Sequence, residues 1–109
     1  MNTTLIMSGD YSVIIVEGRV DTTNAGEFEK EVMAVVESGS EKIILDCSGL
    51  KYISSSGLRV FLIVHKKMLA KKGCLKLCSL QPGIKEIFDI SGFSSIFSIF
   101  PDKQAAEGD

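Results

Sequence analysis

Apolar residues recur along this chain with two different spacings, and each spacing predicts one kind of element. Runs rich in β-branched residues flank Ser8-Gly9-Asp10, a turn signal, so we expect an antiparallel hairpin at the N-terminus. The uninterrupted apolar run Ile43-Ile44-Leu45 is typical of a central strand that is covered on both faces. The predicted strands are 4–7, 11–17, 42–47, 74–78 and 96–100.

Three stretches between these strands have the three- and four-residue apolar spacing of amphipathic helices. The first follows Asn24, which forms a capping-box spacing with Glu27. The second spans 58–72, and the third begins near Pro82 and stops at Gly92.

The second predicted helix is apolar on more than one side. Its core-facing stripe is expected to consist of Leu58, Phe61, Leu62, Met68 and Leu69. The apolar residues outside this stripe either form an exposed patch for a partner or are covered within the domain; they are Val60, Ile63 and Val64.

The elements follow the order β-β-α-β-α-β-α-β, which predicts an α/β fold. Alternation of strands and helices after the hairpin implies right-handed crossovers, and therefore a mixed, mainly parallel sheet with helices packed on it. A length of 109 residues is enough for one core, so we expect a single domain over 1–109. Residues 101–109 read as a polar C-terminal tail that is too short and hydrophilic to predict as a helix.

Composition excludes several classes of function. The formal net charge is −2 and there is no basic block, which argues against nucleic-acid binding. No apolar run reaches the roughly 18–20 residues that cross a bilayer, and no signal peptide is evident, so a cytoplasmic location is expected. Three cysteines fit a reducing compartment. Cys74 and Cys78 would lie about 13 Å apart on a strand, too far to share a metal ion.

The loop Ser54-Ser55-Ser56-Gly57 carries most of the candidate chemistry, because its hydroxyls precede the second helix. A helix start has free backbone N–H groups and favours negative charge, so a serine there can cap, attack, hold a phosphate or accept one. Catalysis is disfavoured, because the single histidine, His65, lies roughly 13 Å from Ser56 along the helix. No phosphate-binding glycine motif occurs. Capping and phosphorylation remain open, and we do not expect an enzyme.

The stretch around this loop resembles a known family. Leu45-Asp46-Cys47-Ser48-Gly49-Leu50-Lys51-Tyr52-Ile53-Ser54-Ser55-Ser56-Gly57-Leu58 is similar to the signature of STAS domains, particularly the bacterial anti-sigma factor antagonists of the SpoIIAA type. Gly18-Arg19-Val20-Asp21 and Ser91-Gly92-Phe93-Ser94-Ser95-Ile96-Phe97 are similar to two further segments of that family. The resemblance covers nearly the whole chain and implies a SpoIIAA-like STAS fold.

This resemblance implies a partner-switching protein. In such antagonists, the unphosphorylated protein binds an anti-sigma factor that is also a serine kinase, which frees the sigma factor for transcription. The kinase phosphorylates the antagonist and a phosphatase resets it. The implied acceptor is Ser56, with Ser55 as the alternative. The implied partner-binding residues are Asp21, Ser54, Ser55, Gly57, Leu58 and Val60. No cofactor or metal is implied, and a monomer or weak dimer is expected.

Two departures from the family pattern keep other functions open. Ser54 stands where the family commonly has aspartate, and no convincing C-terminal helix is evident. The first alternative is a non-switching STAS subunit of a larger assembly or transport system. The second is a nucleotide-sensing STAS domain, although the loop lacks a phosphate-cradle motif.

Overall fold

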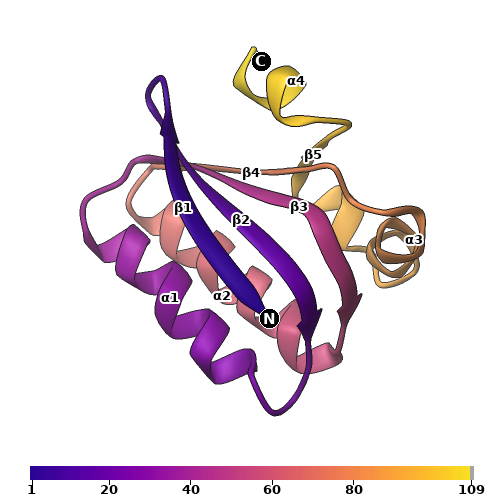
Figure 1. The fold of residues 1–109 in the computed structure, drawn as a ribbon. Helices are drawn as coiled ribbons and strands as arrows, with labels where there is room; N and C mark the ends of the chain where they lie inside the picture. The colour runs from indigo at the N-terminus through magenta and orange to yellow at the C-terminus, as the bar shows by residue number, and fades with distance from the viewer. Residues whose placement is uncertain (109) are drawn as a thin grey trace.

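The computed structural model describes residues 1–108, which form a five-stranded sheet with helices on both faces (Figure 1). The strands lie in the order β1-β2-β3-β4-β5; β1 is antiparallel to β2 and every other pair is parallel. The predicted hairpin and mainly parallel sheet are therefore confirmed. The elements are β1 (Asn2–Ser8), β2 (Tyr11–Val20), α1 (Ala25–Glu37), β3 (Lys42–Ile53), α2 (Ser55–Ala70), β4 (Cys74–Cys78), α3 (Pro82–Ile90), a 3-10 turn (Phe93–Ser95), β5 (Ser98–Phe100) and α4 (Lys103–Glu107).

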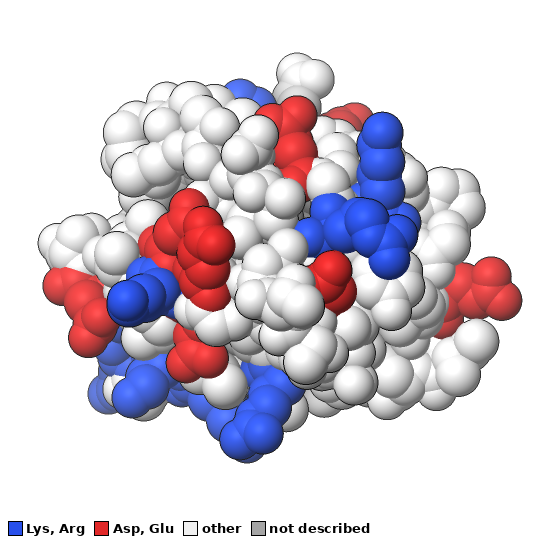
Figure 2. All heavy atoms as spheres, turned by 60° about the horizontal axis from the view of Figure 1, so that its bottom comes forward, with Lys and Arg blue, Asp and Glu red and all other residues white. Residues whose placement is uncertain are grey.

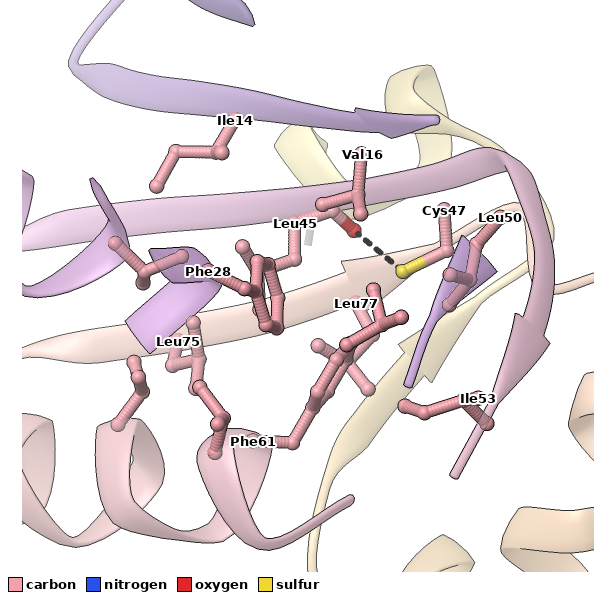
Figure 3. Packing of buried hydrophobic residues seen from close by; sticks show 14 of the residues in the cluster. Ile14, Val16, Phe28, Leu45, Cys47, Leu50, Ile53, Phe61, Leu75 and Leu77 are labelled. Carbon is pink, nitrogen blue, oxygen red and sulfur yellow. Dashed lines mark hydrogen bonds between the residues drawn. The ribbon is translucent and has the colours of Figure 1, made fainter. Parts of the chain in front are cut away.

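The main core lies between one face of the sheet and the helices α1, α2 and α3 (Figure 3). Phe61 of α2 is fully buried at its centre, with its ring 5.7 Å from that of Phe28 in α1 and 5.6 Å from that of Phe88 in α3. Each buried aromatic side chain removes about 150–250 Å² from water, so these three rings contribute much of the hydrophobic stabilisation of the main core. Ile43, Ile44 and Leu45 are all fully buried, which confirms β3 as a central strand.

A smaller core on the opposite face is closed by α4, at a place where the sequence predicted only a polar tail. Asp102 caps this helix by accepting a hydrogen bond from the Ala105 N–H at 2.8 Å. Ala106 is fully buried, and its carbonyl accepts a 2.7 Å hydrogen bond from Nζ of Lys76, a buried residue of β4. Lys76 also donates to the Tyr11 hydroxyl at 2.8 Å. The helix was missed because its stability comes from these distant residues rather than from its own composition.

Strands β2 and β3 are longer than predicted. They end at Val20 and Ile53, whereas the sequence indicated ends at Glu17 and Cys47. Two shifts in register interrupt the pairing of this part of the strands, the second of them next to Gly18, which has φ of +92°. Irregular pairing of this kind has no simple two-residue pattern to reveal it.

Helix α2 is rotated relative to the predicted core stripe. Val60 and Val64 are 3% and 1% exposed and face the core, so the prediction that they lie outside the core stripe was wrong. Leu69, predicted to be buried, is 61% exposed. The helix is apolar around most of its circumference, and it packs against both the sheet and α1. Spacing alone therefore could not determine which of several apolar faces is innermost.

Two smaller predictions were also wrong. The capping box is absent: Asn24 occupies the N-cap position of α1 but makes no side-chain cap hydrogen bond. Its amide instead bonds to the backbone of Arg19 and Asp21, which leaves it unable to cap. The last strand covers only Ser98–Phe100, because the chain before it forms a 3-10 turn.

Candidate functional site

The serine loop lies where the carboxyl ends of β2 and β3 meet the start of α2. Val20 pairs with Ile53 at the end of the sheet, and the Ser54 N–H donates a 2.9 Å hydrogen bond to the Val20 carbonyl. The chain leaves β2 at Asp21 and enters α1 four residues later, so the starts of α1 and α2 both lie at this end of the molecule (Figure 1). Residues from β2, β3, α1 and α2 are thereby brought together at one end of the sheet.

Ser54 is the serine that caps α2. Its backbone is extended, with φ of −87° and ψ of 172°, and its hydroxyl accepts a hydrogen bond from the Gly57 N–H at 3.2 Å. Its carbonyl also accepts the first intrahelical bond, from the Leu58 N–H at 2.9 Å. This is the geometry of an N-cap, which satisfies one of the free N–H groups of the first turn. The capping interpretation of the loop is therefore correct for one of its three serines.

The hydroxyls of Ser55 and Ser56 are not used in this way. Both residues lie in the first turn of α2, Ser55 exposed and Ser56 half-buried. Neither side chain hydrogen-bonds to another residue within 1–108. Ser56 also lines a hollow of about 400 Å³ between the first turns of α1 and α2, whose other walls include Thr22, Glu29 and Arg59. The two hydroxyls are thus placed at a helix start without a structural role in the domain.

Asp21 forms a compact turn beside this loop. Its carboxylate accepts hydrogen bonds from the Thr23 hydroxyl at 2.6 Å and the Thr23 N–H at 2.9 Å. These two bonds hold the pKa of the Asp21 carboxyl below its usual range, the hydroxyl contributing most. Asp21 immediately follows Val20, whose carbonyl binds the Ser54 N–H. A fixed negative charge therefore lies next to the serine loop at neutral pH.

Two residues predicted to bind a partner are buried. Val60 is 3% exposed and packs in the core, so it offers little surface to a partner, although it borders the hollow beside Ser56. Gly57 is also buried, and a Cβ there would lie 2.7 Å from Ile53 Cγ1 and 2.9 Å from Val20 Cγ1. The glycine thus lets α2 approach the strand ends closely, and it does not open the surface to a partner. Leu58 is half-buried against the same core.

Arg19 and Tyr52 form an exposed pair at the same end of the sheet. The sequence pattern did not predict this pair. Arg19 of β2 is paired with Tyr52 of β3, and its guanidinium carbon lies 4.2 Å from the centre of the tyrosine ring. A cation–π contact of this kind fixes the arginine on the surface. Their pairing depends on the register shifts between β2 and β3, which the sequence pattern does not reveal.

Charge on this side of the molecule is mixed. Figure 2, which brings the lower side of Figure 1 forward, shows basic side chains gathered at the lower left, with acidic side chains above them and uncharged ones over much of the rest. This surface carries charge of both signs. It is compatible with a protein partner of ordinary surface chemistry.

Other candidate chemistry finds no support in residues 1–108. The His65 ring packs against Phe97, with ring centres 5.0 Å apart, on the part of α2 remote from its start. All three cysteines are free, and burial raises the pKa of the Cys78 thiol to about 11. Among the described residues there is no group of three candidate metal ligands. None of their helices has the length and apolar character that a membrane crossing demands.

Comparisons with known proteins identify related sequences and structures. Residues 4–106 match the sequence model of the STAS domain family. The chain is 43% identical over 94 residues to BtrV of Bordetella bronchiseptica, a candidate anti-sigma factor antagonist; the match covers 86% of this chain and 81% of BtrV.

Solved structures show the same fold. A crystal structure of a candidate anti-sigma factor antagonist from Thermotoga maritima superposes with a TM-score of 0.92 at 20% identity, covering 97% of this chain and 92% of that one. The phosphorylated form of SpoIIAA from Bacillus gives a TM-score of 0.75 at 20% identity, with 98% and 97% of the two chains covered.

Proposed function

Because the chain belongs to the STAS domain family, we propose that it is an anti-sigma factor antagonist that works by partner switching in the bacterial cytoplasm. Its unphosphorylated form binds an anti-sigma factor that is also a serine kinase, and the sigma factor is released. That kinase then phosphorylates Ser56, which ends the complex, and a phosphatase restores binding. The protein is a substrate and a binding partner in this cycle, and it contributes no catalytic residue.

One observation carries the assignment of the acceptor: the three serines of the loop divide into two classes. The Ser54 hydroxyl is engaged with the Gly57 N–H, whereas those of Ser55 and Ser56 bind no other described residue. Phosphorylation of Ser54 would modify the hydroxyl that caps α2, so its hydrogen bond with the Gly57 N–H would have to be remade by the phosphate. Phosphorylation of Ser56 breaks no hydrogen bond of the domain, and the hollow beside it leaves room for the added group.

The position of Ser56 explains how a phosphate would change binding without unfolding the domain. A phosphate adds a charge of about −1.5 to −2. The first turn of α2 has free N–H groups and the positive end of the helix dipole, which accommodate that charge. The domain therefore persists, and the new charge acts on the docked partner through repulsion and desolvation.

The carboxylate of Asp21 and the side chains of Ser54, Ser55 and Leu58 form the rest of the proposed contact surface. Asp21 supplies a fixed charge, and the loop supplies hydroxyls and a half-buried apolar side chain. Ser54 replaces the aspartate common in the family but caps the helix as aspartate would, since either side chain supplies an oxygen acceptor. The geometry of the loop therefore does not require the missing carboxylate.

A second function is favoured by the same departure. Without a carboxylate at position 54, the partner encounters one negative charge fewer, and a kinase that reads this charge would act slowly. A STAS subunit that binds its partner without switching would tolerate the change. Pull-down of a transporter or large-assembly component, together with no kinase, would select this second function.

Binding and mass measurements with Ser56 variants test the proposal. The partner is the histidine-kinase-like ATPase encoded nearest to the gene, and affinity is measured by calorimetry. We expect Ser56→Asp to weaken binding at least about 100-fold, Ser56→Ala to preserve it, and Ser98→Asp, in β5, to serve as a charge-matched control. Intact mass after incubation with the kinase and ATP should rise by one phosphate in wild type and Ser55→Ala, but not in Ser56→Ala. Unchanged affinity of Ser56→Asp would refute the switch.

A further inference from the structure

Strand β1 is a free edge of the sheet. It pairs with β2 on one side and with no other strand of residues 1–108. It is seven residues long, whereas the opposite edge strand, β5, has three. Figure 1 shows β1 running along the outer side of the sheet. A free edge of this length presents a row of unpaired backbone N–H and C=O groups to another strand.

The sequence of β1 contains none of the features that normally protect an edge strand. Asn2–Ser8 has no charged residue and no proline, and its pairing with β2 continues without a bulge from one end to the other. Leu5 and Met7 are 52% and 66% exposed. Natural edge strands are usually blunted by charges, proline or bulges, because an unprotected edge recruits further strands.

The turn of the hairpin determines which backbone groups face outward. Gly9 and Asp10 form a two-residue turn, and φ of +60° at Gly9 is what a type II′ turn requires at its first position. Ser8 and Tyr11 then close the hairpin as a hydrogen-bonded pair. Hydrogen-bonded and non-hydrogen-bonded pairs alternate along antiparallel strands. The N–H and C=O groups of every second residue therefore point away from β2; these residues are Thr3, Leu5 and Met7.

We propose that β1 pairs with β1 of a second copy of this chain, antiparallel and around a two-fold axis at Leu5. A second copy fits because the strand is complementary to itself. With the axis at Leu5, all seven residues are paired: Leu5 meets its own counterpart, and Thr3 meets Met7 of the other copy. The three outward-facing residues exchange hydrogen bonds in both directions, and no like charges are brought together along the strands.

The side chains of β1 support the same arrangement. Leu5 and Met7 lie on the α1 side of the sheet, where they border a hollow of about 620 Å³ whose wall includes Val35 near the end of α1. In the dimer, the Leu5 and Met7 side chains of both copies gather at the axis and lose exposed apolar surface. A contact limited to one strand and its neighbouring side chains lies at the low end of interface sizes, so the dimer dissociates readily. This inference does not rest on the proposed function.

Sedimentation velocity from roughly 10 µM to 1 mM tests whether the dimer exists. We expect wild type to shift from monomer to dimer over this range, and Leu5→Lys to remain monomeric, with dimerisation weakened at least about tenfold. The control is Ile90→Lys in α3, which places the same charge on an apolar residue that is 79% exposed elsewhere. A monomeric wild type, or equal dimerisation of Leu5→Lys and wild type, would overturn the proposal.

Disulfide trapping tests the register, and it also covers the case that Leu5→Lys fails to fold. In a Cys74→Ser background, the two remaining cysteines are buried. Leu5→Cys places two sulfurs across the axis with Cα atoms roughly 5.5 Å apart, within disulfide range. Thr3→Cys and Met7→Cys, each alone, place them about 13 Å out of register. We expect covalent dimer from Leu5→Cys only; stronger cross-linking of either control would overturn this register.

Discussion

Replacing Gly57 by alanine tests whether the serine loop depends on close packing beneath it. The added Cβ would lie 2.7 Å from Ile53 Cγ1 and 2.9 Å from Val20 Cγ1, closer than such atoms normally approach. Overpacking of this kind costs about 1–3 kcal/mol, while alanine in place of glycine within a helix gains about 0.5–1 kcal/mol. We therefore expect a net loss of up to about 2.5 kcal/mol in the free energy of unfolding.

Gly26→Ala is the matched control, because Gly26 lies in the first turn of α1 and a Cβ there meets nothing within 4 Å. This variant should be more stable than wild type by up to about 1 kcal/mol. Urea unfolding followed by circular dichroism measures both, and the two midpoints should move in opposite directions, by on the order of 1 M for Gly57→Ala. Equal stability of the two variants would refute the claim that Gly57 is a packing residue.

Three further outcomes follow from single contacts of the site and core. Ser54→Ala should lower the free energy of unfolding by about 1 kcal/mol through loss of the cap, whereas Ser54→Asp should preserve it in thermal denaturation. Thr23→Val should let the pKa of Asp21 rise toward its usual range in an NMR titration. The lowered pKa stabilises the fold above the unfolded-state pKa, and this contribution is lost as the pH falls through the folded-state pKa, so wild type should lose more stability in acid than the variant. Burial raises the pKa of Cys78 from 9.0 to about 11, so urea unfolding should become easier as the pH rises through that interval, and less so in Cys78→Ala.

Local signals in the sequence were enough to predict the elements that local chemistry determines. The hairpin was readable because a turn signal separates two β-branched runs, and β4 was predicted with its observed ends, Cys74 and Cys78. Pro82 and Gly92 bracket α3 as expected, with Pro82 at its start and Gly92 at φ of +82° just after its end. Each of these features depends on residues that are neighbours in the chain.

Features that depend on contacts between residues far apart in the chain could not be predicted from the sequence. The rotation of α2, which buries Val60 and Val64, is chosen by the sheet and by α1 together, and an almost continuously apolar helix offers several faces to choose from. The short helix α4 exists because Ala106 meets Lys76, thirty positions earlier in the chain. At the serine loop, the three hydroxyls were recognised as functional candidates, but only the fold determines that Ser54 is the cap and that Ser55 and Ser56 are available.

The N-cap at position 54 separates the stability of the helix start from the recognition of a partner, two properties that are usually linked in a binding loop. The helix start needs only an oxygen acceptor at this position, which Ser, Thr, Asn or Asp each supply. In the proposed complex, in contrast, a docking protein would meet the charge and size of the side chain. If the proposal is correct, substitutions within this set should change recognition of the partner while the fold stays constant. Position 54 is accordingly a site for engineering orthogonal signalling pairs, in which a redesigned antagonist binds one redesigned partner and does not bind the native one.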